Sequence, residues 1–315
     1  MHKENKLSAL FELARNVQGD TPIYNAYGDV RGVIRGRAAV PGLIDLLGDE
    51  LPKLQDKNGA LKRTPGGNAA VENLKIDAAI LRHSLVAQAG AEIIIYKDEA
   101  EAISTGTTGD VVMMSKQSYF ETFEAAPFGQ VANGSEVTAS PFPIKRAAIH
   151  VDAAGGPQTN AGIYGLRFEF NRTTLKGFPS VEDAIMHAIV QGLARTADAV
   201  LLGALVAATP APFTLAAAAS AGVRMSELRG LVGTAGHGAA IDNNGVLRAA
   251  GIAAELTPDM TATIVGSFAR SAVMIRSDVD VIVDRTSVQG DLAVTAWAAL
   301  QPLVPDTSRF WTVEA

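Results

Sequence analysis

The chain has 315 residues, of which 48% are hydrophobic and 19% charged, with a net charge of −6, 30 glycines and no cysteine. These values are typical of a globular protein with a sizeable core, and they exclude disulfides, thiolate metal sites and cysteine nucleophiles. The net negative charge and the lack of a long Lys/Arg block disfavour a protein that binds nucleic acid tightly. We expect neither a secretory signal nor a membrane partner.

The first part of the chain predicts small elements between turns. Leucine, phenylalanine and alanine at helical spacing predict a short amphipathic helix within residues 1–20. Glycines and prolines interrupt residues 28–65, which predicts an extended arm without a core of its own, containing a short apolar helix from Leu43 to Leu54. Helical periodicity follows from Asn68 to Ala91, and Ile93 to Tyr96 is predicted to be a buried strand.

The middle of the chain predicts strands that cannot bury themselves. They are Val111–Met114, Ser118–Phe123, Ala147–Val151 and Tyr164–Phe170. The intervening stretch from Phe128 to Phe142 is poor in large aliphatic residues and rich in Gly, Asn, Ser and Pro. Such strands need a partner surface, because an isolated hairpin buries too little apolar area to be stable. We therefore expect a projecting hairpin that lies on another subunit.

A long helix is predicted from Val181 to Leu205, where apolar residues recur every three or four positions. Ser180 and Asp183 have the spacing of a capping box at its start. Its polar positions are expected to face solvent: Glu182, Asp183, His187, Gln191, Arg195 and Asp198.

The last third predicts a compact mixed region. Phe213–Ala221 is alanine-rich, and Met225–Val232 is predicted to be a helix. The predicted strands are Ala262–Gly266, Val273–Ile275, the segment 278–285 with Val279, Val281 and Val283 on one face, Leu292–Leu303 with Trp297, and Phe310–Val313.

No motif predicts chemistry, so we expect no catalytic, cofactor-binding or metal-binding residues and no enzyme. The loop Gly233–Gly238 could suit a dinucleotide only with a strand before it and a helix after it, and we expect a flexible loop instead. The remaining candidates are interpreted as polar surface. They are the dispersed histidines His2, His83, His150, His187 and His237, and the carboxylate pairs Glu182/Asp183 and Asp278/Asp280. The cluster of Arg31, Arg35 and Arg37 suits a turn or an intersubunit salt bridge.

An ordered set of segments resembles the major capsid proteins of tailed bacteriophages, the Hong Kong 97 fold. Gly165–Arg172 followed by the Ser180–Leu205 helix looks like the end of that family's extended loop running into its spine helix. Gly251–Glu255 followed by Gly266–Phe268 is similar to the segment that enters the family's last strands. Residues 266–275, the 278–285 strand, the Trp297 strand and the Phe310–Trp311 finish complete the order.

The resemblance implies an α+β fold of the Hong Kong 97 type, with an N-terminal arm, an extended β-hairpin loop, a long spine helix, and peripheral and axial domains. The implied divisions are residues 1–65 for the arm, 66–118 for a mixed segment, 119–172 for the extended loop, 173–210 for the spine helix of the peripheral domain, 211–268 for the axial domain, and 269–315 for the peripheral strands and the C-terminal axial strand.

The resemblance also implies a structural function. The subunit would self-assemble as hexamers and pentamers into the icosahedral virion head that encloses double-stranded DNA without sequence-specific binding, in the cytoplasm of the host. Further partners would be scaffolding, portal and decoration proteins. Some family members cross-link through a lysine and an asparagine, for which Lys116 and Lys145 are candidates here. The alternatives are an encapsulin-type compartment shell, marked by enzyme cargo and an N-terminal helix in place of a long arm, and a soluble α/β nucleotide-binding enzyme that uses the Gly233–Gly238 loop.

Overall fold

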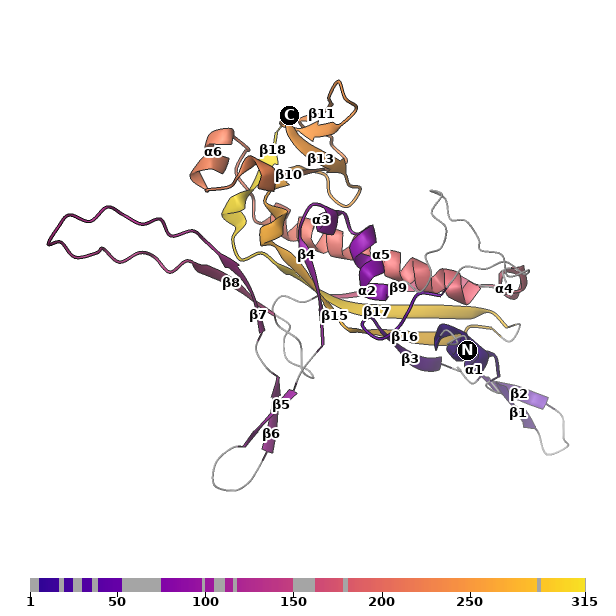
Figure 1. Ribbon diagram of the computed structural model, residues 1–315. Helices are drawn as coiled ribbons and strands as arrows, with labels where there is room; N and C mark the ends of the chain where they lie inside the picture. Colours follow the sequence, from indigo (N-terminus) through magenta and orange to yellow (C-terminus); the bar gives the residue numbers. More distant parts are fainter. Residues whose placement is uncertain are drawn as a thin grey trace.

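The computed structural model describes most of the chain in segments. These are residues 6–16, 20–24, 30–35, 39–52, 75–97, 100–104, 111–115, 118–149, 162–177, 181–287 and 290–314. Two six-stranded sheets dominate the described chain, and a long helix runs along the first of them toward the second (Figure 1). The α+β class expected from the sequence is confirmed.

The first sheet, here called the central sheet, is built around the 12-residue strand β17. β17 (Leu292–Leu303) pairs on one side with β9 (Gly162–Phe170). On its other side it pairs with β15 (Ala272–Arg276) and β16 (Asp278–Arg285), which lie end to end. β4 (Glu92–Tyr96) pairs with β15, and β3 (Ala39–Asp45) pairs with β16, so these two strands form the edge of the sheet. Ser277 joins the two halves, because its N–H donates to the Tyr96 carbonyl at 2.8 Å and its carbonyl accepts the Leu46 N–H at 2.9 Å. The sheet is therefore continuous across the junction.

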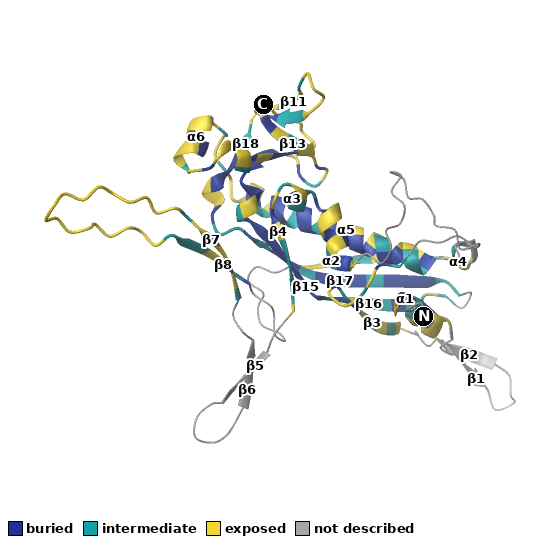
Figure 2. Cartoon of the chain, in the orientation of Figure 1, coloured by how far each residue is buried: buried dark blue, intermediate teal, exposed yellow. Residues whose placement is uncertain are grey.

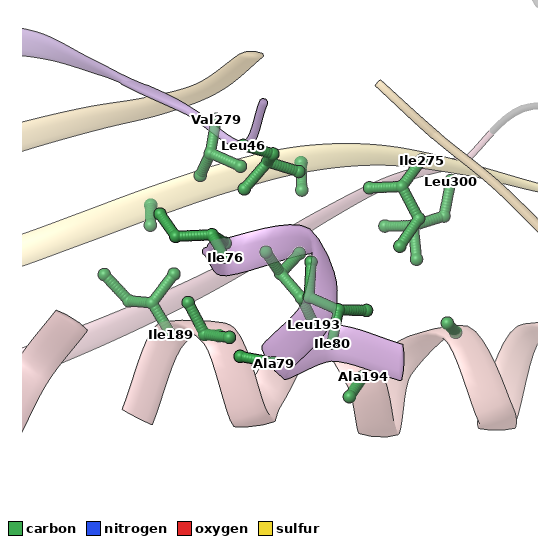
Figure 3. Packing of buried hydrophobic residues seen from close by; sticks show 14 of the residues in the cluster. Leu46, Ile76, Ala79, Ile80, Ile189, Leu193, Ala194, Ile275, Val279 and Leu300 are labelled. Carbon is green, nitrogen blue, oxygen red and sulfur yellow. The ribbon is translucent and has the colours of Figure 1, made fainter. Parts of the chain in front are cut away.

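Helices cover one face of the central sheet. They are α1 (Lys6–Asn16), α2 (Ile76–His83), α3 (Leu85–Gln88) and α5 (Val181–Ala207). In Figure 3, α2 lies between α5 and the strands, with Ile76 and Ile80 among the residues that fill the space. The long helix predicted from Val181 is confirmed as α5, while the cap residue Ser180 lies outside the described residues.

Strand alternation assigns residues to the two faces of the central sheet. Val279, Val281 and Val283 share one face of β16, as predicted; they are at most 1% exposed and belong to the core under the helices. In β15, Val273 and Ile275 face the same core, whereas Met274 packs on the opposite face with Phe120 and Ile149. Because successive residues of a strand point to opposite faces, one end of this sheet has a core on both sides.

The second sheet carries a core of its own. Its strands in spatial order are β11 (Ala239–Ile241), β12 (Leu247–Ala249), β13 (Ile252–Leu256), β10 (Arg229–Val232), β14 (Thr263–Gly266) and β18 (Phe310–Val313). Trp311 packs edge-on against Phe213, with ring centroids 5.9 Å apart, beside α6 (Leu215–Ser220). The chain enters this sheet after α5, leaves it after β14 for the central sheet, and returns with β18.

Three further hairpins extend from this body in Figure 1. They are β1 (Asp20–Tyr24) with β2 (Val30–Arg35), β5 (Ala100–Ser104) with β6 (Val111–Ser115), and β7 (Ser118–Phe123) with β8 (Ile144–Ile149). The short helix α4 (Arg172–Gly177) follows β9. Figure 2 shows that the β7–β8 hairpin runs out into an exposed loop, while the central sheet and the inner side of α5 are buried.

Several expectations about the first 91 residues are wrong. Where a helix was predicted from Leu43 to Leu54, the described residues form the end of β3 and a turn, because the segment pairs with β16, and residues 53 and 54 lie outside the described residues. The segment also has a core, contrary to the prediction, since the side chains of Ile44 and Leu46 are at most 1% exposed. The predicted helix near the N-terminus is confirmed as α1, and its Leu7, Phe11 and Ala14 are equally buried. The helical stretch predicted from Asn68 to Ala91 is helical in its described part but is divided at Ser84 into α2 and α3, and residues 68–74 lie outside the described residues.

Two other predicted elements change partner or type. β9 does not belong to the projecting hairpin, because it pairs along all nine residues with β17 in the central sheet. The predicted helix Met225–Val232 is a short 3-10 turn, η2 (Met225–Glu227), followed by β10. Tertiary pairing with β13 and β14 overrides the local helical spacing in the second case.

The helix α5 is long and apolar enough to cross a membrane by length and composition. In this structure its apolar side chains pack under the central sheet, with residues such as Ile189, Leu201 and Leu202 at most 1% exposed. The helix is therefore the core helix of the described domain.

Asp198 is the one residue of the predicted polar face of α5 that is buried, at 2% exposure. Its carboxylate accepts hydrogen bonds from Ser84 Oγ at 2.6 Å, from the Leu85 N–H at 2.9 Å and from the Val86 N–H at 3.1 Å. Burial raises the pKa of Asp198, and these three hydrogen bonds oppose that shift. Asp198 therefore caps α3 from another helix and ties α2 and α3 to α5.

We expect Asp198→Ala to lower the free energy of unfolding by about 2–4 kcal/mol, because it leaves buried donors without an acceptor. Urea unfolding followed by circular dichroism measures this loss. Gln191→Ala on the exposed side of the same helix is the control and should change stability by less than about 0.5 kcal/mol. Equal effects of the two variants would contradict the capping role.

Candidate functional site

The loop of the β7–β8 hairpin, residues 124–143, extends away from the rest of the subunit and is here called the arm. Every residue from 125 to 142 is exposed. Its large apolar side chains have no core contact, with Phe128 fully exposed and Val137 and Phe142 77% and 74% exposed. Glu136 is the only charged residue between positions 125 and 142. A surface this apolar and this accessible is typical of a protein interaction site.

The root of the arm is anchored by an apolar cluster on the open face of the central sheet. Phe120 of β7 and Ile149 of β8 pack against Ala272, Met274 and Leu303. The Gln301 amide donates to the Ala148 carbonyl at 3.0 Å, and the Arg270 guanidinium donates to the Phe123 carbonyl at 3.1 Å. The two limbs are closed where the Glu124 N–H donates to the Pro143 carbonyl at 2.7 Å.

Charged residues form a second anchor, here called the root cluster: Glu124, Lys145, Asp306 and Arg309. Lys145 Nζ lies 2.8 Å from Asp306 Oδ2 and 3.3 Å from Glu124 Oε1. Arg309 lies 3.2 Å from Glu124 and 3.3 Å from Asp306, and it also donates to the Ala221 carbonyl at 2.7 Å. Since Asp306 and Arg309 immediately precede β18, the root cluster joins the arm to the second sheet as well as to the central sheet.

Asp306 is the most strongly perturbed group of the cluster. Burial opposes its ionisation, but hydrogen bonds from Lys145 and from the Ser308 hydroxyl and N–H outweigh burial and lower its pKa well below the ordinary value. The hydrogen bond from Arg309 likewise lowers the pKa of Glu124. Both shifts favour the ionised form of the carboxylates, which is the form that pairs with Lys145 and Arg309.

This arrangement predicts how stability depends on pH. Because the folded-state pKa of Asp306 lies below its unfolded value, its stabilising contribution is complete above about pH 4 and is lost as the pH falls further. We expect Asp306→Asn to cost about 3 kcal/mol at pH 7, near the lower end for breaking a buried ion pair, and the difference from the unchanged protein to shrink below about pH 4.

Chemical denaturation of both proteins between pH 7 and pH 3 measures this difference. Glu169→Gln, which removes an exposed ion pair with Arg167, is the control and should cost at most about 1 kcal/mol. A difference for Asp306→Asn that stays constant over this pH range would show that the root cluster does not depend on the Asp306 charge.

The Gly233–Gly238 loop is not a nucleotide site in this structure. A strand, β10, precedes it, contrary to the expected helix, but β11 and no helix follows. Its N–H groups are already used, since those of Gly233, Thr234 and Ala235 donate to the carbonyls of residues 262, 260 and 261 at 3.0–3.1 Å. A phosphate therefore finds no helix N-terminus here, and the first N–H groups of the loop are already bonded to carbonyls.

The other predicted candidates are dispersed or outside the described residues. His187 Nε2 is 2.7 Å from the Pro52 carbonyl, and His83 and His237 are exposed. His2, His150, Arg37 and Lys116 lie outside the described residues, while Lys145 is engaged within its own chain. Within the described segments, no group of three or more His, Asp or Glu side chains could hold a metal ion.

Solved structures similar to this chain are phage and particle shells. They include the capsid of an empty GTA particle (TM-score 0.45, 13% identity, 81% of this chain and 95% of that chain), the satellite phage P4 procapsid that includes the size determination protein Sid (0.43, 10%, 76% and 97%), and Mycobacterium phage Che8 (0.42, 11%, 71% and 94%). No family model and no curated protein sequence matches the chain.

At these identities no residue role is carried over from a capsid to this chain. The arm and the root cluster are properties of its own residues. The arm was indicated by the sequence, because the stretch from Phe128 to Phe142 has little that could form a core. The root cluster was not, since it joins residues 124 and 145 to residues 306 and 309, and nothing in local spacing relates them.

Proposed function

We propose that this chain is the structural subunit of a closed protein shell, the major capsid protein of a tailed phage, and not an enzyme. One observation carries the proposal: residues 125–142 of the arm are all exposed, while the root of the arm is held by ion pairs and by packing against the body. A subunit that works alone gains nothing from exposing Phe128, Val137 and Phe142, whereas an obligate assembly buries such residues in interfaces of about 2,000–5,000 Å².

In this proposal the parts of the fold have separate roles. The central sheet with α5 forms the peripheral domain, the second sheet forms the axial domain around which copies meet as hexamers and pentamers, and the arm reaches over a neighbouring copy. The arm's near-neutral composition suits contact with another protein. The acidic net charge of −6 suits the inner wall of a container that must not hold its DNA tightly.

The test is the content of particles recovered from cells that express the full chain with its natural partners. The proposal predicts closed particles that protect double-stranded DNA from nuclease. Particles that instead hold a cargo enzyme would identify an encapsulin-type compartment. The N-terminal helix expected for that alternative is present as α1. The helix therefore does not distinguish a phage capsid from an encapsulin-type compartment, whereas the contents of the particles do. A chain that forms no particle would contradict both.

A further inference from the structure

The chain contains three Asn-Gly pairs, which begin at residues 58, 133 and 244. The first lies outside the described residues. Asn133–Gly134 lies in the exposed loop of the arm (Figure 2), and Asn244–Gly245 lies in the turn between β11 and β12. All four residues are exposed, so water from the solvent reaches both pairs.

An Asn-Gly pair can react with itself, because the glycine nitrogen follows directly after the asparagine side chain. Glycine has no Cβ to obstruct the approach of its nitrogen to the side-chain carbonyl carbon, and it takes backbone conformations that other residues avoid. The reaction requires the backbone to bring these two atoms together. The hydrogen bonds that hold a pair in place therefore decide how readily it reacts.

The turn at Asn244 is held by hydrogen bonds on both sides of the pair. Asp242 Oδ1 accepts the Asn244 N–H at 2.9 Å and the Val246 N–H at 3.0 Å. The Gly245 N–H, whose nitrogen would attack, donates to the Asp242 carbonyl at 3.0 Å. The Arg248 guanidinium donates to Asp242 Oδ2 at 2.8 Å and holds the carboxylate in place. The attacking nitrogen is therefore engaged, and the backbone around it is restrained.

The turn at Asn133 has far fewer restraints. It is closed by one hydrogen bond, from the Ser135 N–H to the Ala132 carbonyl at 3.0 Å. Among the described residues, no hydrogen-bond partner holds the Gly134 N–H or the Asn133 side chain. Gly134 has a φ of +85°, and a Cβ added there would have no atom within 4 Å, so the backbone has room to move.

We propose that Asn133 is a site of spontaneous deamidation, whereas Asn244 is protected by its turn. The Gly134 nitrogen bonds to Cγ of Asn133, and the side-chain nitrogen leaves as ammonia with the proton that the Gly134 nitrogen loses. A water molecule from the solvent then opens the resulting cyclic imide. Opening at the side-chain carbonyl gives aspartate, and opening at the main-chain carbonyl gives isoaspartate, in which the main chain continues through Cγ. The conversion consumes water, releases ammonia and changes no oxidation state.

Deamidation changes the charge of the arm. Glu136 is the only charged residue between positions 125 and 142, and the product adds a second carboxylate at position 133. Charged groups are depleted from the core of protein interfaces, because an unpaired charge is costly to bury. The consequence for assembly rests on the proposed function, in which contacts between copies bury the arm. Subunits that have deamidated at Asn133 are therefore expected to be excluded from growing shells.

Peptide mass spectrometry of the purified full chain tests the modification site. The chain is incubated at mildly alkaline pH, at a concentration below that at which particles form, and the peptides that contain Asn133 and Asn244 are followed over time. We expect Asn133 to convert at least about tenfold faster than Asn244. The control is the same chain in urea, where both turns are lost and the two rates should converge. Equal rates in the folded chain would overturn the proposal, and so would a difference that persists unchanged in urea.

Assembly of a partly converted sample tests the consequence of the added charge. Particles and unassembled subunits are separated by sedimentation, and both fractions are analysed by the same mass spectrometry. We expect the converted form of Asn133 to be depleted at least about fivefold in the particles, whereas conversion of Asn244 should not differ between the fractions. Equal conversion of Asn133 in both fractions would overturn the consequence for assembly. Fresh protein that forms no particle would overturn the proposed function, while the rates in the folded chain would still decide the modification site.

Discussion

Removing the arm should abolish particle formation without destabilising the subunit. In this variant an Asn-Gly pair replaces residues 125–142, so that Glu124 and Pro143, which already share a hydrogen bond, are joined by a two-residue hairpin turn. All the removed residues are exposed, and a shorter loop has a lower entropy of closure, so the free energy of unfolding should not fall. Sedimentation velocity measures assembly, and urea unfolding measures stability.

The matched point variant is Phe128→Ala, which shortens one fully exposed side chain on the arm. It should leave the unfolding midpoint unchanged and reduce assembly at a fixed protein concentration at least about tenfold, the effect of about 1.4 kcal/mol lost at an interface hot spot. Normal particles formed by the armless chain would contradict the role of the arm. An armless chain that unfolds more readily would show instead that the arm supports the fold of its own subunit.

Replacing Phe310 by alanine should have the largest effect on the subunit itself, a loss of about 3–5 kcal/mol in the free energy of unfolding. Phe310 is 2% exposed and packs edge-on against Phe268, with ring centroids 5.5 Å apart. It belongs to the main core, whereas the next residue, Trp311, belongs to the core of the second sheet. The two faces of β18 therefore join both cores.

Urea unfolding of Phe310→Ala tests this connection, with Phe142→Ala as the control because Phe142 is 74% exposed. We expect the control to unfold like the unchanged protein. A loss below about 1 kcal/mol for Phe310→Ala would show that the space around Phe268 closes without it. Two separate unfolding transitions would show that the sheets fold independently once the link is weakened.

The sequence predicts the elements whose pattern repeats. The helix α5 is apolar at helical spacing over many turns, and Val279, Val281 and Val283 alternate over a whole strand, so local periodicity is enough in both cases. The prediction fails where pairing partners are distant. Each of β3 and β10 is a strand because a neighbouring strand pairs with it, which their own residues do not indicate.

The same distinction holds for the candidate site. The arm could be predicted, because a long stretch that is poor in large aliphatic residues cannot form a core of its own. The sequence predicts Asp198 on the solvent face, because helical periodicity indicates only the side of the helix on which a residue lies. It does not indicate that Ser84 and the start of α3 pack on that side and donate hydrogen bonds to Asp198. The root cluster likewise arises from contacts between distant segments.

The most direct test of the shell function is electron microscopy of the purified full chain, across a range of protein and salt concentrations. We expect closed shells of uniform diameter, in which each arm lies over the body of a neighbouring copy. Small particles of one or two subunits under all these conditions would contradict it.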